Sequence, residues 1–124
     1  MGKPLSKQEL HNLAMNIVGR QLEAEGFEFL GVNSKLKKNP QFVCLKEKQL
    51  YFIVVRNVAY PDDPQVYDKA LMKKIKIHAD KHQQGAKVYY AGVGLSNAKD
   101  PKIPVYLNED YVVEYRGPIE VDYA

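Results

Sequence analysis

One internal segment of the chain is nearly all apolar: LYFIVVRNV, residues 50–58. A strand that is apolar on both faces is typical of the centre of a sheet that is covered from both sides. A second segment, KVYYAGVG at residues 87–94, has the same character, and a helical pattern separates the two. Strand, helix and strand in this order predict a right-handed crossover, and therefore a parallel pair of central strands.

The helix between these strands is expected to begin soon after the first strand ends. Asp63 fits an N-cap and Pro64 fits the first helical position. The helical step places Lys69, Lys73 and Lys76 on the face away from the sheet. The stripe expected to face the sheet comprises Tyr67, Leu71, Ile75, His78, Ala79 and His82.

The N-terminal part of the chain predicts one helix and two short strands. Ser6–Glu9 is a capping box, an apolar stripe follows it, and Gly26 ends the pattern, so we expect a helix over residues 6–25. The strands are predicted at residues 27–32 and at QFVCL, residues 41–45. A short polar turn at residues 46–49 joins the strand at residues 41–45 to the long apolar strand at residues 50–58, so these two strands are expected to form a hairpin.

The C-terminal part of the chain predicts a long loop and two short strands. Residues 96–110 contain several turn-forming residues and predict a long loop. Residues 111–115 and 119–123 alternate with period two and predict edge strands, arranged as a hairpin or as a dimer contact.

The element order α-β-β-β-α-β, followed by two short strands, predicts an α/β (α+β) fold with a mixed sheet and helices packed on it. A length of 124 residues fits one domain, residues 1–124, with a core at about 6–95 and a C-terminal extension at about 96–124. The single Cys excludes a disulfide framework and a Cys-rich zinc site. No apolar run approaches the ~20 residues of a membrane span, and no secretory signal pattern is present, so we expect a cytoplasmic protein.

The net charge of +3 is unevenly distributed along the chain. Residues 33–99 hold thirteen Lys or Arg and five Asp or Glu, which gives +8, whereas residues 1–32 carry −1 and residues 100–124 carry −4. A basic segment of this kind suits phosphate groups, although lysines also solvate exposed faces without binding anything. The candidate phosphate contacts are Lys35, Lys37, Lys38, Arg56, Lys73 and Lys76.

Residues 8–95 resemble a known fold in the order of their elements and in a set of residues. The residues that carry the resemblance are Leu22, Gly26-Phe27, Leu30, Asn33, Lys35, the strand Phe52-Ile53-Val54-Val55-Arg56 and the helical segment Lys73-Lys74-Ile75-Lys76. Together they resemble the restriction-endonuclease-like fold, and more closely the small Holliday-junction-resolvase-like branch of the PD-(D/E)XK superfamily. The resemblance implies a nuclease-like αβββαβ core, to which this chain adds two C-terminal strands.

The same resemblance implies a degenerate active site. The family places an Asp on the first hairpin strand, and a Glu or Asp two residues before a Lys on the second, to hold a divalent metal. Here the Asp position falls near Gln41 or Phe42, the second acid position falls on Val54, and only Arg56 keeps the charge of the Lys. Arg stays protonated and cannot act as a base. The chain is therefore expected to have no catalytic residue, metal or cofactor at this hairpin.

Other chemistry-bearing residues have ordinary structural explanations. His78 and His82 have the i, i+4 spacing that can bind zinc, but no third ligand is near in sequence, so we expect them to pack. Cys44 lies in an apolar strand and is expected to be a buried small hydrophobe.

Three functions remain open on the sequence. The first is a non-catalytic nuclease-like module that binds nucleic acid weakly through its basic middle. The second is a homodimerisation or protein-interaction module that uses the Tyr-rich C-terminal strands. The third is a metal-dependent nuclease with relocated carboxylates, such as Glu28 or Asp62.

Overall fold

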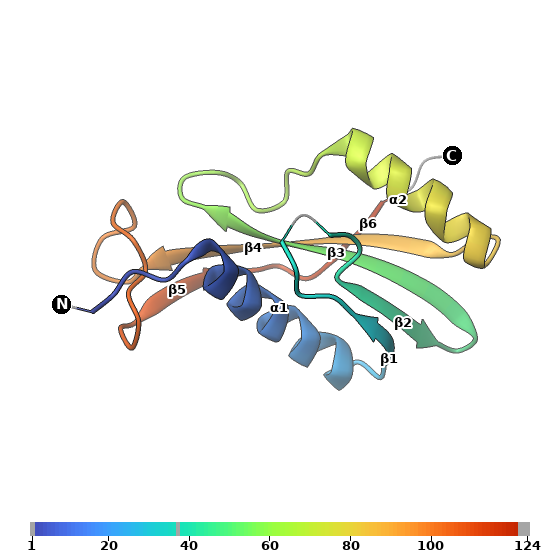
Figure 1. The fold of residues 1–124 in the computed structure, drawn as a ribbon, viewed down its shortest axis with the longest axis horizontal. Coiled ribbons are helices and arrows are strands. Elements are labelled where there is room, and N and C mark those ends of the chain that lie inside the picture. Colours follow the sequence, from blue (N-terminus) through green and yellow to red (C-terminus); the bar gives the residue numbers. More distant parts are fainter. Residues whose placement is uncertain (1, 37, 122–124) are drawn as a thin grey trace.

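The computed structural model describes residues 2–36 and 38–121. They form a mixed α+β fold in which two helices pack on a six-stranded sheet, as the sequence predicts (Figure 1). None of the described helices is long and apolar enough to cross a membrane. In chain order the elements are α1 (Lys7–Ala24), β1 (Glu28–Val32), β2 (Phe42–Lys46), β3 (Gln49–Ala59), α2 (Lys69–His82), β4 (Lys87–Asn97), β5 (Tyr111–Glu114) and β6 (Ile119–Val121).

The sheet has the order β1-β2-β3-β4-β5, and β6 also pairs with β4. The predicted parallel pair is confirmed: β3 and β4 run side by side from Tyr51 opposite Lys87 to Ala59 opposite Leu95. All the other strand pairs are antiparallel. The two longest strands therefore form the middle of the sheet, as their apolar composition indicates.

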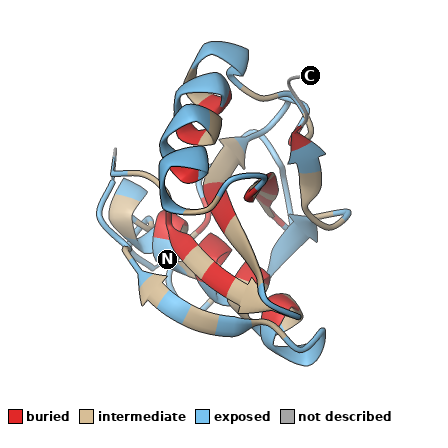
Figure 2. Ribbon diagram, turned by 90° about the vertical axis from the view of Figure 1, so that its right-hand side faces the viewer, coloured by how far each residue is buried: buried red, intermediate tan, exposed pale blue. Residues whose placement is uncertain are grey.

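The helices cover opposite faces of this sheet (Figure 1). Along β3, Ile53 and Val55 pack in the cluster under α1, whereas Phe52 and Val54 pack in the cluster under α2. In Figure 2 the buried residues gather on the central strands and on the inner sides of the helices. Because side chains alternate along a strand, a run that is apolar at every position fills two cores at once.

Both ends of α1 follow the sequence prediction. The Ser6 hydroxyl accepts a hydrogen bond from the Glu9 amide, and the Glu9 carboxylate accepts one from the Ser6 amide, which completes the capping box. Gly26 has a φ of +90°, a conformation that favours glycine and that turns the chain toward β1.

The start of α2 differs from the prediction. The helix begins at Lys69 with Asp68 as its N-cap, not at Pro64 after Asp63. The reason is tertiary: Pro64 is buried, and its carbonyl group lies directly against Gly92 of β4. The chain first crosses the sheet at this point, and only afterwards turns into the helix.

The inner stripe of α2 also differs from the prediction, because His78 and His82 are exposed. Met72, Ile75 and Ala79 are its buried residues. Tyr67 lies ahead of the helix but still packs in the same cluster, with its ring centroid 5.4 Å from that of Tyr90.

The C-terminal strands differ from a hairpin. Strand β4 extends to Asn97, so the connection predicted from residue 96 begins two residues later. β5 and β6 do not pair with each other; β5 pairs with residues 94–97 of β4 and β6 with residues 88–90, end to end along its outer edge. The strand predicted at 119–123 is described as far as Val121, because residues 122–124 lie outside the described residues.

The close approach of Pro64 to Gly92 gives a test of this packing. Replacing Gly92 with Ala places a Cβ in overlap with the Pro64 carbonyl oxygen and 2.9 Å from a Tyr90 ring carbon. Since backbone cannot move aside cheaply, we expect the free energy of unfolding to fall by about 3 kcal/mol. Chemical denaturation measures this value.

Gly31→Ala is the matched control, because it makes the same change within a strand where the nearest atom is Val43 Cβ at 3.9 Å. We expect it to change the free energy of unfolding by less than about 0.5 kcal/mol. Equal effects of the two substitutions would contradict this account of the crossing.

Candidate nucleic-acid interface

Arg56 leaves β3 near its C-terminal end and is half-buried. Its guanidinium group is held by three oxygen atoms. Nη1 donates to the carbonyl oxygen of Val55 at 2.9 Å and to Oε1 of Gln41 at 3.3 Å, and Nη2 donates to Oδ1 of Asn39 at 2.7 Å. These bonds hold the charged group where β3 extends past the first residue of β2, next to the connection between β1 and β2.

Gln41 is the centre of this cluster and is fully buried. Its main-chain N–H donates to the Ile53 carbonyl oxygen at 3.0 Å, and its main-chain carbonyl oxygen accepts from the Asn33 amide at 2.8 Å. These two bonds continue the sheet by one residue ahead of β2. Its side-chain Oε1 also accepts from the Val55 amide at 2.7 Å, and Nε2 donates to the Lys38 carbonyl oxygen. A side-chain amide thus takes the place of a peptide group where the strand ends.

The charge of Arg56 is only partly offset within the described residues, by the more distant carboxylate of Asp68. The hydrogen-bond acceptors of Arg56 are neutral oxygens, and no described carboxylate forms an ion pair with it. Burial lowers the pKa of Arg56, while Tyr90 and Asp68 raise it in part. An Arg keeps its proton throughout the physiological range despite such shifts. The cluster therefore presents a held cation without an ion-pair partner among the described residues, which favours an anionic group from outside the chain.

His11 of α1 lies close enough to this cluster to be affected by its charge. The side chain is 3% exposed, and its Nε2 has no hydrogen-bond partner among the described residues. Burial lowers the pKa of His11, and the charge of Arg56 lowers it further. The sequence reasoning missed this residue, although its spacing from Met15 and Val18 places all three on one helix face.

The predicted lysines do not form one patch in the described structure. Lys35 and Lys38 are exposed on the β1–β2 connection, which Gln41 and Asn39 tie to Arg56. Lys37 lies outside the described residues. The other two lysines belong to α2, on a different part of the surface.

These α2 lysines have different environments. Lys73 is exposed. Lys76 is half-buried, and its Nζ donates to the Ala86 carbonyl oxygen at 2.6 Å and pairs with Asp80 at 3.1 Å. Of the six candidates, Lys35 and Lys38 therefore lie on the connection that adjoins Arg56, and Lys76 is already used within the fold.

The residues weighed for other chemistry lie apart. His78 and His82 are exposed, and their ring centroids are 6.0 Å and 5.7 Å from that of Phe52, so both pack on this ring. Glu28 and Asp62 are exposed on β1 and in the turn after β3. Among residues 2–36 and 38–121 no three His, Cys, Asp or Glu side chains come together as a metal site.

Cys44 is fully buried, as predicted for a small hydrophobe in an apolar strand. Burial raises the pKa of its thiol to about 11. The thiolate, which is the reactive form, is therefore disfavoured at neutral pH.

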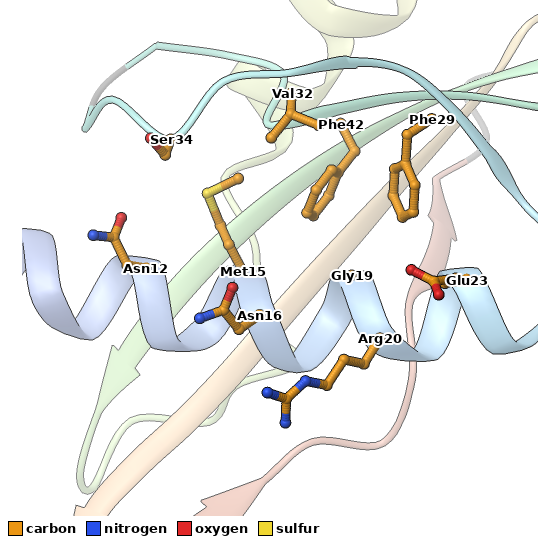
Figure 3. Close-up of a pocket in the computed structure, with 10 residues that line it drawn as sticks. All are labelled: Asn12, Met15, Asn16, Gly19, Arg20, Glu23, Phe29, Val32, Ser34 and Phe42. Carbon is orange, nitrogen blue, oxygen red and sulfur yellow. The ribbon is translucent and has the colours of Figure 1, made fainter.

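A groove of about 520 Å³ runs between α1 and β1, on the side of the sheet that α1 covers (Figure 3). Its floor is apolar: Met15, Phe29 and Phe42 point into the space above Gly19, whereas Arg20 points away from these rings. A Cβ at position 19 would lie 3.4 Å from the Phe42 ring, so the glycine keeps this space open. The groove is separate from the hydrogen bonds that hold Arg56.

The family model that matches this chain extends from α1 to β6. It is described as a domain of unknown function, DUF8840, and it matches residues 8–121. The chain belongs to the DUF8840 family. No curated protein and no solved structure gives a significant match. The DUF8840 match spans both helices and the whole sheet, and therefore includes the Arg56 cluster.

The buried His11 predicts a pH dependence of stability. Because its pKa is lower in the folded protein than the 6.5 of the free side chain, the unfolded chain takes up a proton first as the pH falls. The contribution of His11 is thus complete above about pH 6.5 and is lost as the pH drops below it. Denaturation curves from pH 7.5 to 5 measure this slope.

Replacing His11 with Leu removes the titrating group and the unpaired nitrogen. We expect the free energy of unfolding at pH 7 to change by less than about 1 kcal/mol, because an apolar side chain needs no hydrogen bond there. The slope between pH 6.5 and 5 should become flatter than in the unchanged protein. An identical slope in both proteins would show that His11 is not protonated on unfolding in this range.

Proposed function

We propose that this chain is a non-catalytic, nuclease-like module that binds nucleic acid weakly through its basic middle segment, in the cytoplasm. The observation that carries the proposal is Arg56, a half-buried guanidinium held by neutral oxygens, with no carboxylate partner among the described residues. Such a group favours an external anion, and the phosphate groups of nucleic acid are arranged as a row of anions. Lys35 and Lys38 are exposed on the connection that adjoins Arg56 and add two positive charges to this part of the chain.

The element order supports the nuclease-like part of the proposal. The structure has an α-β-β-β-α-β order, with helices on both faces and a parallel β3–β4 pair. The family's acid position falls near Gln41 or Phe42 and its Lys position on Arg56, and Gln41 accepts a hydrogen bond from Arg56 here.

The residues at the family's metal-binding positions support the proposal that the module is non-catalytic. A divalent metal prefers carboxylate oxygens, whereas Gln41 offers a neutral amide and Val54 is a buried apolar residue. The amide oxygen of Gln41 is already used by the Val55 amide and by Arg56. The cluster is therefore suited to holding a phosphate group and not to activating water on it.

Binding is tested with a fluorescent duplex and a single strand over a range of salt concentrations. We expect weak binding that falls steeply as salt increases, because each neutralised phosphate releases counterions. Changing Lys35 and Lys38 to Gln together should reduce the magnitude of the negative slope of log K against log salt by about 2. Lys102→Gln, at an exposed site outside the basic segment, is the control and should leave the slope unchanged.

A substitution at Gln41 tests Arg56 without removing its charge. Gln41→Glu keeps the length of the side chain but places a carboxylate beside the guanidinium, and so supplies an internal partner. We expect affinity to fall by about ten-fold at low salt, because this partner competes with phosphate. Absence of binding by the unchanged protein at low salt, or a flat salt response, would overturn the proposal. Cleavage of branched or linear DNA with Mg²⁺ or Mn²⁺ would overturn its non-catalytic part.

A second candidate function, homodimerisation through the C-terminal strands, is supported by β5. This strand is the last one on its side of the sheet, and all of its residues are exposed. Tyr111, Val112 and Val113 are 41%, 51% and 42% exposed. An apolar edge strand of this kind is a template for pairing with another strand, and antiparallel pairing of two β5 strands continues both sheets across a two-fold axis.

Val113→Lys tests the dimer while leaving β6 in place. A charged lysine at the strand edge opposes pairing, and its exposed position leaves the core unchanged. If β5 forms the contact, the unchanged protein elutes as a dimer in size-exclusion chromatography with light scattering, and the variant as a monomer. A monomer in both cases would exclude this function at the concentrations used.

A further inference from the structure

A second hollow, of about 540 Å³, lies at the C-terminal end of α1. It opens on the same face of the sheet as α1, just beyond the point where the helix ends. The residues that matter for its chemistry are Glu25, Phe27, Lys46, Glu47, Tyr51 and Tyr89. None of them belongs to the Arg56 cluster.

Three aromatic rings form the apolar part of this hollow. Phe27 and Tyr51 have centroids 4.9 Å apart and ring planes at 84°, so they stand as two perpendicular walls. Tyr89, from the adjoining strand, is 5.4 Å from Tyr51. All three are half-buried, so part of each ring remains accessible. The faces of such rings carry negative electrostatic potential and attract cations.

The chain itself places a cation on one of these rings. The Nζ of Lys46 lies 4.9 Å from the centroid of Phe27, within the range of a cation–π interaction. This ammonium group forms no ion pair with a described carboxylate. The ring face, and not a carboxylate, therefore holds it in place.

The charges around the hollow also favour a cation. Glu25 is the C-cap of α1, and the last turn of this helix has no basic residue, so the negative end of the helix dipole is not offset. Glu25 and Glu47 form no ion pair with a described residue. Burial raises the pKa of Tyr89, and the negative charges of Glu120 and Glu25 contribute to this rise.

Arg116 also lines the hollow, but its guanidinium group interacts with residues outside it. Nη2 of Arg116 lies 3.8 Å from a Glu114 carboxylate oxygen, and Nη1 donates to Gln65 at 3.4 Å. Lys46 is thus the cation that the Phe27 ring holds, and its long, flexible side chain can leave this ring at low cost.

We propose that this hollow is a binding site for a small organic cation with an alkylammonium head, which displaces Lys46 from the aromatic walls. The rings supply the face for the cation, and Glu25 and Glu47 supply the countercharge. Lys46 acts as an internal competitor that occupies the site in the free protein. This site favours a cation, whereas the Arg56 cluster favours an anion. The proposal does not depend on nucleic-acid binding.

Choline is a suitable probe, with its neutral isostere, in which carbon replaces the nitrogen, as the matched control. We expect choline to shift the amide NMR signals of Phe27, Lys46, Tyr51 and Tyr89, with a Kd on the order of 1 mM. The isostere has the same shape but no charge, so it should bind at least about three-fold more weakly. Equal binding of the two probes would show a merely apolar hollow and would overturn the proposal.

Three variants test the role of the named charges. Lys46→Gln removes the internal competitor and should tighten choline binding by about three-fold, whereas Lys48→Gln at the nearby exposed hairpin should not. Glu25→Gln removes an exposed countercharge and should weaken choline binding by about three-fold, with no effect on the isostere. If Lys46→Gln leaves choline binding unchanged or weakens it, Lys46 does not occupy the site. No shift with choline in any of these proteins would overturn the proposal entirely.

Discussion

The parallel pairing of β3 with β4 is the constraint on which the rest of the structure depends. Nine consecutive pairs, from Tyr51–Lys87 to Ala59–Leu95, join these strands. Parallel strands need a long crossover, and here the crossover places α2 on one face. The other face must then be covered by a different element, which is α1. The requirement to bury both faces of one strand pair thus determines where both helices lie.

The same strand pair positions the polar groups that distinguish this chain. Where β3 continues past the end of its antiparallel partner β2, backbone groups would be left without partners. Gln41 satisfies them with its own side chain and, in doing so, holds Arg56 at the edge of the apolar core. The structural and the proposed binding role of this cluster therefore come from one feature. A rigidly held guanidinium loses little entropy when an anion binds to it.

The charge distribution of the two proposed sites follows from their places in the fold. The Arg56 cluster lies where the basic middle of the chain meets the end of the sheet, and its oxygen partners are neutral. The aromatic hollow lies beyond the C-terminal end of α1, where the helix dipole and Glu25 are both negative. A single small domain can thus present surfaces for opposite charges, because the electrostatic environment is set locally.

The sequence by itself determined the elements and the class of the fold. The capping box at Ser6, the glycine at position 26 and the two apolar strands act locally or through periodicity, so they could be recognised without a structure. The tertiary structure alone decided where α2 begins, because Pro64 first packs on Gly92. It also decided that Gln41 holds Arg56, that His11 is buried within reach of its charge, and that Lys76 is already used within the fold. These outcomes depend on contacts between residues far apart in the chain, and such contacts leave no periodic signal in the sequence.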